Sequence, residues 1–257
     1  MRFMYYLKNH LTFEKKEIRD ILITAVCLGF ILSFKHWGGA YFDIVVGLKN
    51  FVGMFLVALF SILIAIFVQK LISIKTGYKA KYKAWLLGLL IGLYICFISD
   101  GDWYLFLPGG IIISSIELHR IAKHRKMLRL RDKAFILFFG PFTFIVLAYL
   151  FRAFFISGAS NLLVERAVIL NMALAVYTIL PIPQIEALFP RLHFKETANL
   201  NGFEIFYWSK TVYVFSFLFI IVMTSMLFWT NIISAMFVAG VLAIVMALIY
   251  FYFRRLK

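Results

Sequence analysis

Long apolar runs alternate with short polar segments along the whole chain. Crossing a hydrocarbon core of ~30 Å takes about 20 apolar helical residues, because a helix rises 1.5 Å per residue. The runs that approach this length are Ile21–Phe34, Phe51–Val68, Ala84–Ser99, Ala134–Phe151, Ala167–Pro183 and Thr211–Phe253. The last holds 43 residues without a charge, enough for two helices with a turn near Thr230 and Asn231. The pattern predicts an all-α, polytopic membrane helix bundle of about six to seven spans.

One apolar segment does not fit a spanning helix. Trp103–Ile116 is short for a span and is interrupted by Pro108, Gly109 and Gly110. Irregular backbone is tolerated at membrane depth only where protein covers it. We therefore expect a short re-entrant or strand segment near Trp103–Ile116.

The composition excludes several classes of protein. Of the 257 residues, 63% are hydrophobic and 15% are charged. A soluble domain carries roughly 25% charged residues and buries only about three quarters of its unfolded surface. A soluble enzyme, a disordered chain and a disulfide-stapled secreted domain are therefore all disfavoured, and the lipid bilayer is the first expected partner.

The basic residues predict how the chain is oriented. Lys and Arg number 27 against 12 acidic residues, and 23 of the 27 lie before Asp20, in 69–83, 117–133 and 184–210, or in the tail. Cytoplasmic loops of membrane proteins collect Lys and Arg, so this excess needs no nucleic acid. These basic segments all lie on the same side of the membrane if residues 84–116 enter it and return to the side from which they started. We therefore expect a multi-pass protein of the cell (cytoplasmic) membrane with a cytoplasmic N-terminus.

The organisation follows from the same pattern. Residues 1–257 form one integral membrane domain, in which 1–20 is a cytoplasmic amphipathic segment and 211–253 a C-terminal helical hairpin. No signal peptide is expected, because the first apolar run follows a segment of mixed charge and precedes no small-residue cleavage site.

Few polar residues inside the runs could carry chemistry. Asn171 lies within the fifth run, where an amide forms an interhelical hydrogen bond or contacts a substrate. His119 and His124, near Glu117, are five residues apart and so occupy different faces of a helix. Another group of possible ligands, Glu186, His193 and Glu196, lies on a polar connection. A solvated basic or polar surface is the simpler interpretation of both groups.

Several short motifs together resemble one known family. Asn171, Leu180–Pro183 and Leu200–Gly202 resemble the second motif region of the site-2 protease family of intramembrane zinc metalloproteases. Phe139–Phe144 (FGPFTF) is similar to that family's Gly-Pro stretch in a core helix. Gln69–Gly92 is similar to the sequence that follows the zinc-binding helix in minimal prokaryotic members, and WYLFLPGGIII resembles the Pro-Gly strand segment of those members. The motifs keep their order, and the resemblance implies a site-2-protease-like core over residues 51–215.

The zinc-binding residues of that family are missing. In the register of the resemblance, HExxH is replaced by the five residues Ala65 to Gln69, so both histidines and the glutamate are absent. The aspartate ligand corresponds to Asn201 if 184–200 is an insertion, which we prefer, or to Glu186 without a gap. Catalytic zinc needs three protein ligands and a water molecule. The resemblance therefore implies a member without a metal cofactor, with a relict groove at Asn171, Pro181, Pro183, Asn201 and Gly202.

Three functions follow as hypotheses. The first is a non-catalytic, site-2-protease-like membrane protein that binds or scaffolds other membrane proteins. The second is a divergent active intramembrane metalloprotease that holds zinc through Glu117, His119, His124, Glu186 or His193. A transporter or channel is third, since it would require buried charges that the apolar runs almost entirely lack.

Overall fold

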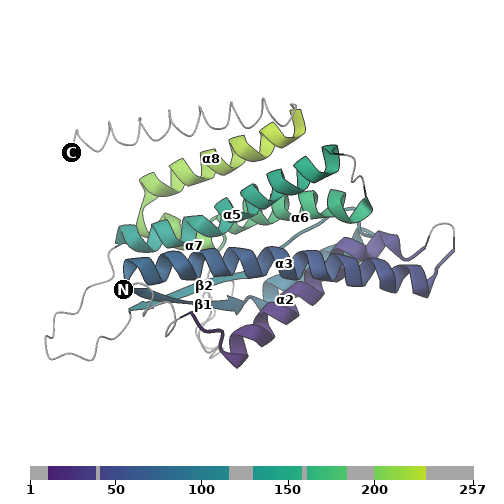
Figure 1. Cartoon of the computed structure of the whole chain (residues 1–257), viewed down its shortest axis with the longest axis horizontal. Coiled ribbons are helices and arrows are strands. Elements are labelled where there is room, and N and C mark those ends of the chain that lie inside the picture. The colour runs from purple at the N-terminus through teal and green to yellow at the C-terminus, as the bar shows by residue number, and fades with distance from the viewer. Residues whose placement is uncertain (1–10, 39–40, 116–129, 158–160, 184–199, 230–257) are drawn as a thin grey trace, which may run out of the picture.

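Most of the chain that the structure describes is helical. The computed structural model describes residues 11–38, 41–115, 130–157, 161–183 and 200–229. Its elements, in chain order, are α2 (Lys15–Ser33), the short 3-10 helix η1 (Phe34–His36), α3 (Ile44–Thr76), β1 (Tyr78–Ala84), α4 (Leu86–Ile98), β2 (Gly109–Ser115), α5 (Leu130–Ile156), α6 (Leu162–Ile179), α7 (Asn201–Trp208) and α8 (Lys210–Trp229) (Figure 1). Seven α-helices and one small antiparallel sheet thus make up the described part of the molecule.

Four of the described helices are long and apolar enough to cross a membrane. They are α3, α5 over Asp132–Ile156, α6, and α8 over Lys210–Leu227. They support the expected multi-pass membrane protein. The expected count of six to seven is not reached in the described residues, and the second helix of the predicted hairpin lies beyond them.

The predicted spans Ile21–Phe34 and Ala84–Ser99 correspond to α2 and α4, and neither helix resembles a simple membrane crossing. α2 is 19 residues long, but five of its first six residues are charged, so the segment expected to be a separate N-terminal amphipathic stretch is in part the beginning of α2. α4 has 13 residues and a length of about 20 Å, which is short of a ~30 Å hydrocarbon core.

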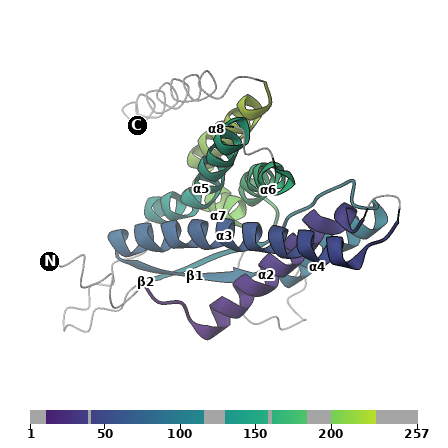
Figure 2. The same ribbon diagram turned by 45° about the vertical axis from the view of Figure 1, so that its right-hand side comes forward.

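α3 runs along the long axis of the molecule, and α2 packs against it at an oblique angle with the opposite chain direction (Figures 1 and 2). The Asp43 side chain caps the start of α3 by accepting hydrogen bonds from the amides of Val45 (2.8 Å) and Val46 (3.2 Å). α3 ends at Gly77, whose φ of 88° is left-handed and suits glycine. The chain then reverses into β1.

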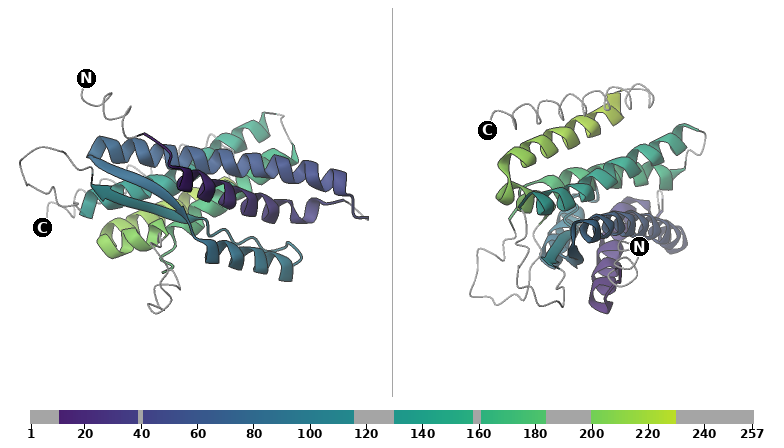
Figure 3. Two further views of the ribbon diagram at one scale, coloured as in Figure 1. Left: turned by 90° about the horizontal axis from the view of Figure 1, so that it is seen from below. Right: turned by 60° about the vertical axis from the view of Figure 1, so that its left-hand side comes forward.

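The sheet pairs β1 with β2 from Tyr78↔Ser115 to Ala84↔Gly109. β2 therefore forms within the segment where the sequence predicts a strand or re-entrant piece. β1 corrects the sequence analysis, which treated 69–83 as a polar connection. Its lysines alternate with buried Tyr and Ala side chains, as a strand of period two requires. Seen from below, the two strands lie in front of the long helices (Figure 3, left).

Residues 102–108 return along α4 as an extended chain. A Cβ on Gly88 would lie 2.9 Å from Cβ of Leu107, and one on Gly92 would lie 2.5 Å from the carbonyl oxygen of Leu105. The two glycines, four residues apart, therefore let the extended chain pack closely on the helix. Residues 102–115 thus run back beside α4 and β1, which gives an out-and-back path where the sequence analysis expects one for residues 84–116.

The remaining helices form a second layer. α5, α6, α7 and α8 lie on one side of α3, while α2 and the sheet lie on the other (Figures 1 and 2). A shared apolar core joins the two layers through fully buried side chains such as Ile62 of α3, Ile145 of α5 and Leu170 of α6. α3 is therefore the central element, and its face toward α5 and α6 is the place to look for buried polar groups.

Candidate functional site

Two side-chain amides meet on the face of α3 that packs against α5. Gln69 of α3 and Asn201 at the start of α7 are 3% and 4% exposed. A Cβ on Gly140 of α5 would lie 2.5 Å from Nδ2 of Asn201 and 2.7 Å from Nε2 of Gln69. Both amide nitrogens thus lie beside the same point on the α5 backbone, which only a glycine leaves open. Three sequence motifs far apart in the chain converge here.

Gln69 compensates for a proline in α5. Pro141 has no N–H, so the carbonyl of Leu137, four residues earlier, lacks its helical donor. Nε2 of Gln69 lies 3.3 Å from that carbonyl oxygen and 3.4 Å from the carbonyl oxygen of Ile136, and donates to both. Gln69 therefore satisfies a buried backbone acceptor that Pro141 leaves open.

Two further positions of the predicted site lie on the same face of α3. Ala65, one turn before Gln69, is 2% exposed. One turn earlier again, Ser61 Oγ accepts a hydrogen bond of 2.9 Å from Nδ2 of Asn171 in α6. Asn171 is fully buried, and its Nδ2 also donates to the carbonyl of Ala167 at 2.8 Å. The interhelical hydrogen bond that the sequence offers as one role for Asn171 is thus present.

The oxygen atoms of both asparagines have no protein partner in the part of the chain that the structure describes. Oδ1 of Asn171 and Oδ1 of Asn201 are buried without a hydrogen-bond donor there. A buried, unpaired carbonyl costs about 1–3 kcal/mol relative to a paired one. Each oxygen is therefore able to accept a hydrogen bond from water or from another molecule.

The prolines predicted to line the groove lie at the end of α6. Pro181 and Pro183 are exposed, and Ile182 between them packs against a small cluster of Trp85, Leu107 and Leu200. Gly202 lies directly against the carbonyl oxygen of Ile179, where any Cβ would clash. The loop after α6, the start of α7 and the base of the sheet are therefore neighbours.

The donor set at this place does not fit zinc. Zinc binds thiolate, imidazole and carboxylate groups. Ala65 offers a methyl group, and Gln69 and Asn201 offer neutral amides. Within the described ranges, no three His, Cys, Asp or Glu side chains gather as metal ligands would. The alternative ligands at Glu117, His119, His124, Glu186 and His193 lie outside the described residues, as does Glu196.

A second buried polar cluster joins α2, α3 and β1. Nζ of Lys70 lies 2.7 Å from Oε2 of Glu17, and both side chains are 3% exposed. Oε1 of Glu17 accepts the backbone N–H of Tyr82 at 2.9 Å, and the Tyr82 hydroxyl donates to the carbonyl of Pro108 at 2.7 Å. The sequence analysis missed this cluster. Its only signals in the sequence were Glu17, shortly before the first apolar run, and Lys70, shortly after the second.

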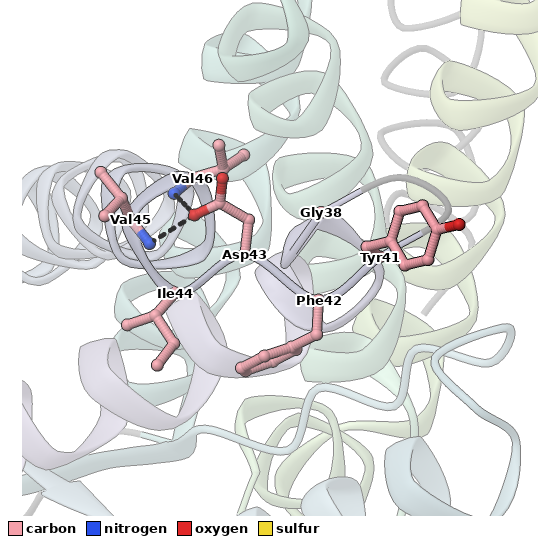
Figure 4. A pocket seen from close by; sticks show the side chains of 7 residues that line it. All are labelled: Gly38, Tyr41, Phe42, Asp43, Ile44, Val45 and Val46. Atoms are coloured by element: carbon pink, nitrogen blue, oxygen red, sulfur yellow. Dashed lines mark hydrogen bonds between the residues drawn. The ribbon is translucent and has the colours of Figure 1, made fainter.

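A hollow of about 670 Å³ lies at the other end of α3, between Gly38 and Val46. Figure 4 shows the Asp43 side chain turned toward the amides of Val45 and Val46, so its carboxylate is occupied as the helix cap. The remaining lining is mostly apolar and exposed, with no further charged side chain among its residues. The hollow therefore does not form part of the site around Gly140.

Comparison with known proteins found no matching family, no similar curated protein and no similar solved structure.

Proposed function

We propose that this chain is a site-2-protease-like multi-pass membrane protein that has lost zinc and proteolytic activity and binds other membrane proteins. The observation that carries the proposal is the meeting of Gln69 and Asn201 at Gly140. These residues belong to three separate motifs of the resemblance. In the register of the resemblance, Gln69 and Asn201 correspond to a histidine and an aspartate ligand of the family.

The proposed loss of chemistry follows from what these positions now do. Nε2 of Gln69 is engaged with the carbonyl groups of Ile136 and Leu137, and Ala65 has no atom that could bind a metal. In this proposal, the position that corresponds to the family's second histidine serves to pack α3 against α5. We place the protein in the cell (cytoplasmic) membrane with its N-terminus in the cytoplasm, following the distribution of Lys and Arg.

The second edge of β2 is where a partner segment would bind. On β1, the amide of Tyr82 points outward to Glu17, so Tyr82↔Ile111 is a pair without ladder hydrogen bonds. By the same alternation, the backbone groups of Ile111 and Ile113 point away from β1. In the described residues β2 has β1 as its one strand neighbour, so this edge can accept an extended segment of another membrane protein.

Rebuilding the metal site tests the proposed arrangement. The variant A65H/Q69H/N201D places two imidazoles one turn apart on α3 and a carboxylate at the start of α7. If the positions correspond to the family's ligands, the purified variant should hold close to one zinc ion per chain by elemental analysis. The unmodified protein should hold none.

The matched control moves the histidines to another face of α3. F67H/L71H/N201D keeps the spacing of four residues, but Phe67 is 42% exposed and faces away from the core. It should bind no stoichiometric zinc. A folded A65H/Q69H/N201D variant that holds no more zinc than this control would contradict the arrangement. Removable stoichiometric zinc and proteolytic activity in the unmodified protein would contradict the loss of catalysis.

Crosslinking in native membranes tests the binding role. A photoreactive residue at Ser114, the exposed end of β2, or at Pro181 should capture a defined membrane protein, identified by mass spectrometry. The control positions are Leu218 of α8 and Val26 of α2, two apolar side chains that are 49% and 45% exposed. Equal capture at all four positions, or capture of lipid alone, would argue against a partner site at the sheet.

A further inference from the structure

A row of lysines lies along one face of β1. Lys79, Lys81 and Lys83 alternate with the buried residues of the strand, and all three are half-exposed. Side chains two residues apart in a strand project from the same face. The row therefore concentrates three positive charges on one face of a two-stranded sheet.

One carboxylate already bridges two of these lysines. Oε1 of Glu14, just before α2, lies 2.6 Å from Nζ of Lys81 and 3.2 Å from Nζ of Lys79. The hydrogen bonds from Lys81 and Lys79 hold the pKa of Glu14 below its usual value. The Glu14 side chain is 43% exposed, so an incoming anion can reach the same place.

The surroundings of the row are more basic than a single glutamate can balance. Lys15 and Lys16 follow Glu14 directly, and both are exposed. Lys75, in the last turn of α3, is exposed as well. The surface at the start of α2 and along β1 therefore carries a clear excess of positive charge.

An apolar stripe adjoins this basic surface. Ile18, Leu22 and Val26 lie four residues apart on α2 and are 46%, 42% and 45% exposed. Their spacing puts them on one side of the helix, suited to contact lipid chains. Lys15 and Lys16 lie at the end of this stripe, where acyl chains give way to headgroups.

We propose that Lys79 and Lys81 bind the phosphate of an anionic lipid headgroup, and that Glu14 occupies this place when the lipid is absent. The charge selects an anion, and the row supplies adjacent ammonium donors. The neighbouring apolar stripe favours a lipid over an acidic peptide, since the acyl chains of a bound lipid would lie along exposed Ile18, Leu22 and Val26.

Replacing Glu14 and replacing the lysines should have opposite effects on anionic-lipid binding. Removing one lysine takes away an attractive charge, whereas removing the Glu14 charge takes away a competitor. Near a membrane surface a single Lys or Arg changes binding about fivefold. K81Q should therefore weaken anionic-lipid binding about fivefold, and E14Q should strengthen it by a similar factor.

The experiment uses the full chain, purified in detergent and titrated with phosphatidylglycerol, phosphatidylcholine, inorganic phosphate or a glutamate-rich peptide. Bound ligand is counted by native mass spectrometry. Phosphatidylglycerol should bind best, K79Q/K81Q should abolish its preference over phosphatidylcholine, and E14Q should raise its affinity. K210Q, which removes an exposed lysine at the start of α8, is the matched control and should behave like the unmodified protein.

Three results would overturn the proposal. The first is unchanged phosphatidylglycerol binding in K79Q/K81Q. The second is weaker rather than tighter binding in E14Q. The third is equal or better binding of the peptide or of inorganic phosphate, which would assign the site to a protein partner or to a free ion. Melting temperatures of all variants, expected to match the parent because the replaced side chains are exposed, separate lost binding from lost folding.

Discussion

Gln69 illustrates how one polar residue in an apolar helix can have a purely structural task. Pro141 deprives the carbonyl of Leu137 of its helical donor, and the Gln69 amide supplies a replacement from α3. The same side chain reaches Ile136 and approaches Asn201. Gln69 thus links α3 to α5.

The Gln69–Pro141 relation predicts a non-additive pair of substitutions. Q69L should destabilise the protein by about 1–3 kcal/mol, because it leaves a buried carbonyl unpaired. In a P141A background, residue 141 donates its own N–H to Leu137, and the cost of Q69L should fall. Unfolding in mixed detergent and SDS measures all four variants. Equal costs of Q69L in both backgrounds would show that Gln69 does not serve the Leu137 carbonyl.

Part of this site could be predicted from the sequence. The order of motifs singles out Ala65, Gln69, Asn171, Asn201 and Gly202. A proline inside an apolar run also predicts that one backbone carbonyl of the helix lacks its N–H donor. The sequence could not reveal that Gln69 donates a hydrogen bond to that carbonyl, nor that Asn171 donates one to Ser61. Such contacts depend on how α3, α5 and α6 are rotated against one another, and apolar helices carry little amphipathic signal to fix that rotation.

At the scale of elements, β1 depends on both neighbouring helices. Glu17 of α2 accepts the Tyr82 amide, and Lys70 of α3 neutralises Glu17. Three elements thus meet at one buried ion pair. Breaking such a pair by removing one partner is costly, because the remaining charge stays buried without compensation.

The Lys70–Glu17 pair predicts a rescue. K70M should destabilise the protein by about 3–5 kcal/mol, because it leaves the Glu17 carboxylate unpaired. Adding E17Q should recover much of this loss, since glutamine is neutral and its oxygen still accepts the Tyr82 amide. Thermal unfolding in detergent provides the comparison. A double variant no more stable than K70M would mean that charge burial is not the source of the cost.

Hydropathy predicts the long helices well but not β1. The runs at 51–68, 134–151 and 167–183 fall within or largely overlap α3, α5 and α6. Residues 78–84 carry three lysines and look like a loop by charge, although Tyr78, Ala80, Tyr82 and Ala84 alternate with them. That period-two pattern was the available signal for a strand. The three lysines obscured it, because Glu14, which forms ion pairs with Lys79 and Lys81, lies far away in the sequence.

The whole molecule has two chemically different ends. α3 spans most of the long axis of the described molecule: β1, with Lys79, Lys81 and Lys83, follows it at one end, and Tyr41 precedes it at the other (Figure 1). Tyr41 is 89% exposed. Under the proposed orientation, which follows from the distribution of Lys and Arg, the basic end faces the cytoplasm.

This orientation predicts which residues a membrane-impermeant reagent can reach. In a background in which Cys27 and Cys96 are replaced by serine, Y41C should react with an impermeant maleimide in intact cells. K16C should react only in inverted vesicles. Labelling is read from the mass of the purified protein. Labelling of K16C in intact cells would reverse the assigned orientation.

The extended return along α4 bears on how the protein is made. Apart from the Leu137 carbonyl of α5, which Gln69 serves, α3, α5, α6 and α8 satisfy their own backbone hydrogen bonds and can enter lipid as separate helices. β1 and β2 cannot, because each requires the other, and β1 also requires Glu17. During biosynthesis, we expect the excursion from Tyr78 to Ser115 to form after α2 and α3, in a single cooperative step. A ribosome-bound chain that ends before β2 leaves the backbone groups of β1 that face β2 without their partners until that strand emerges.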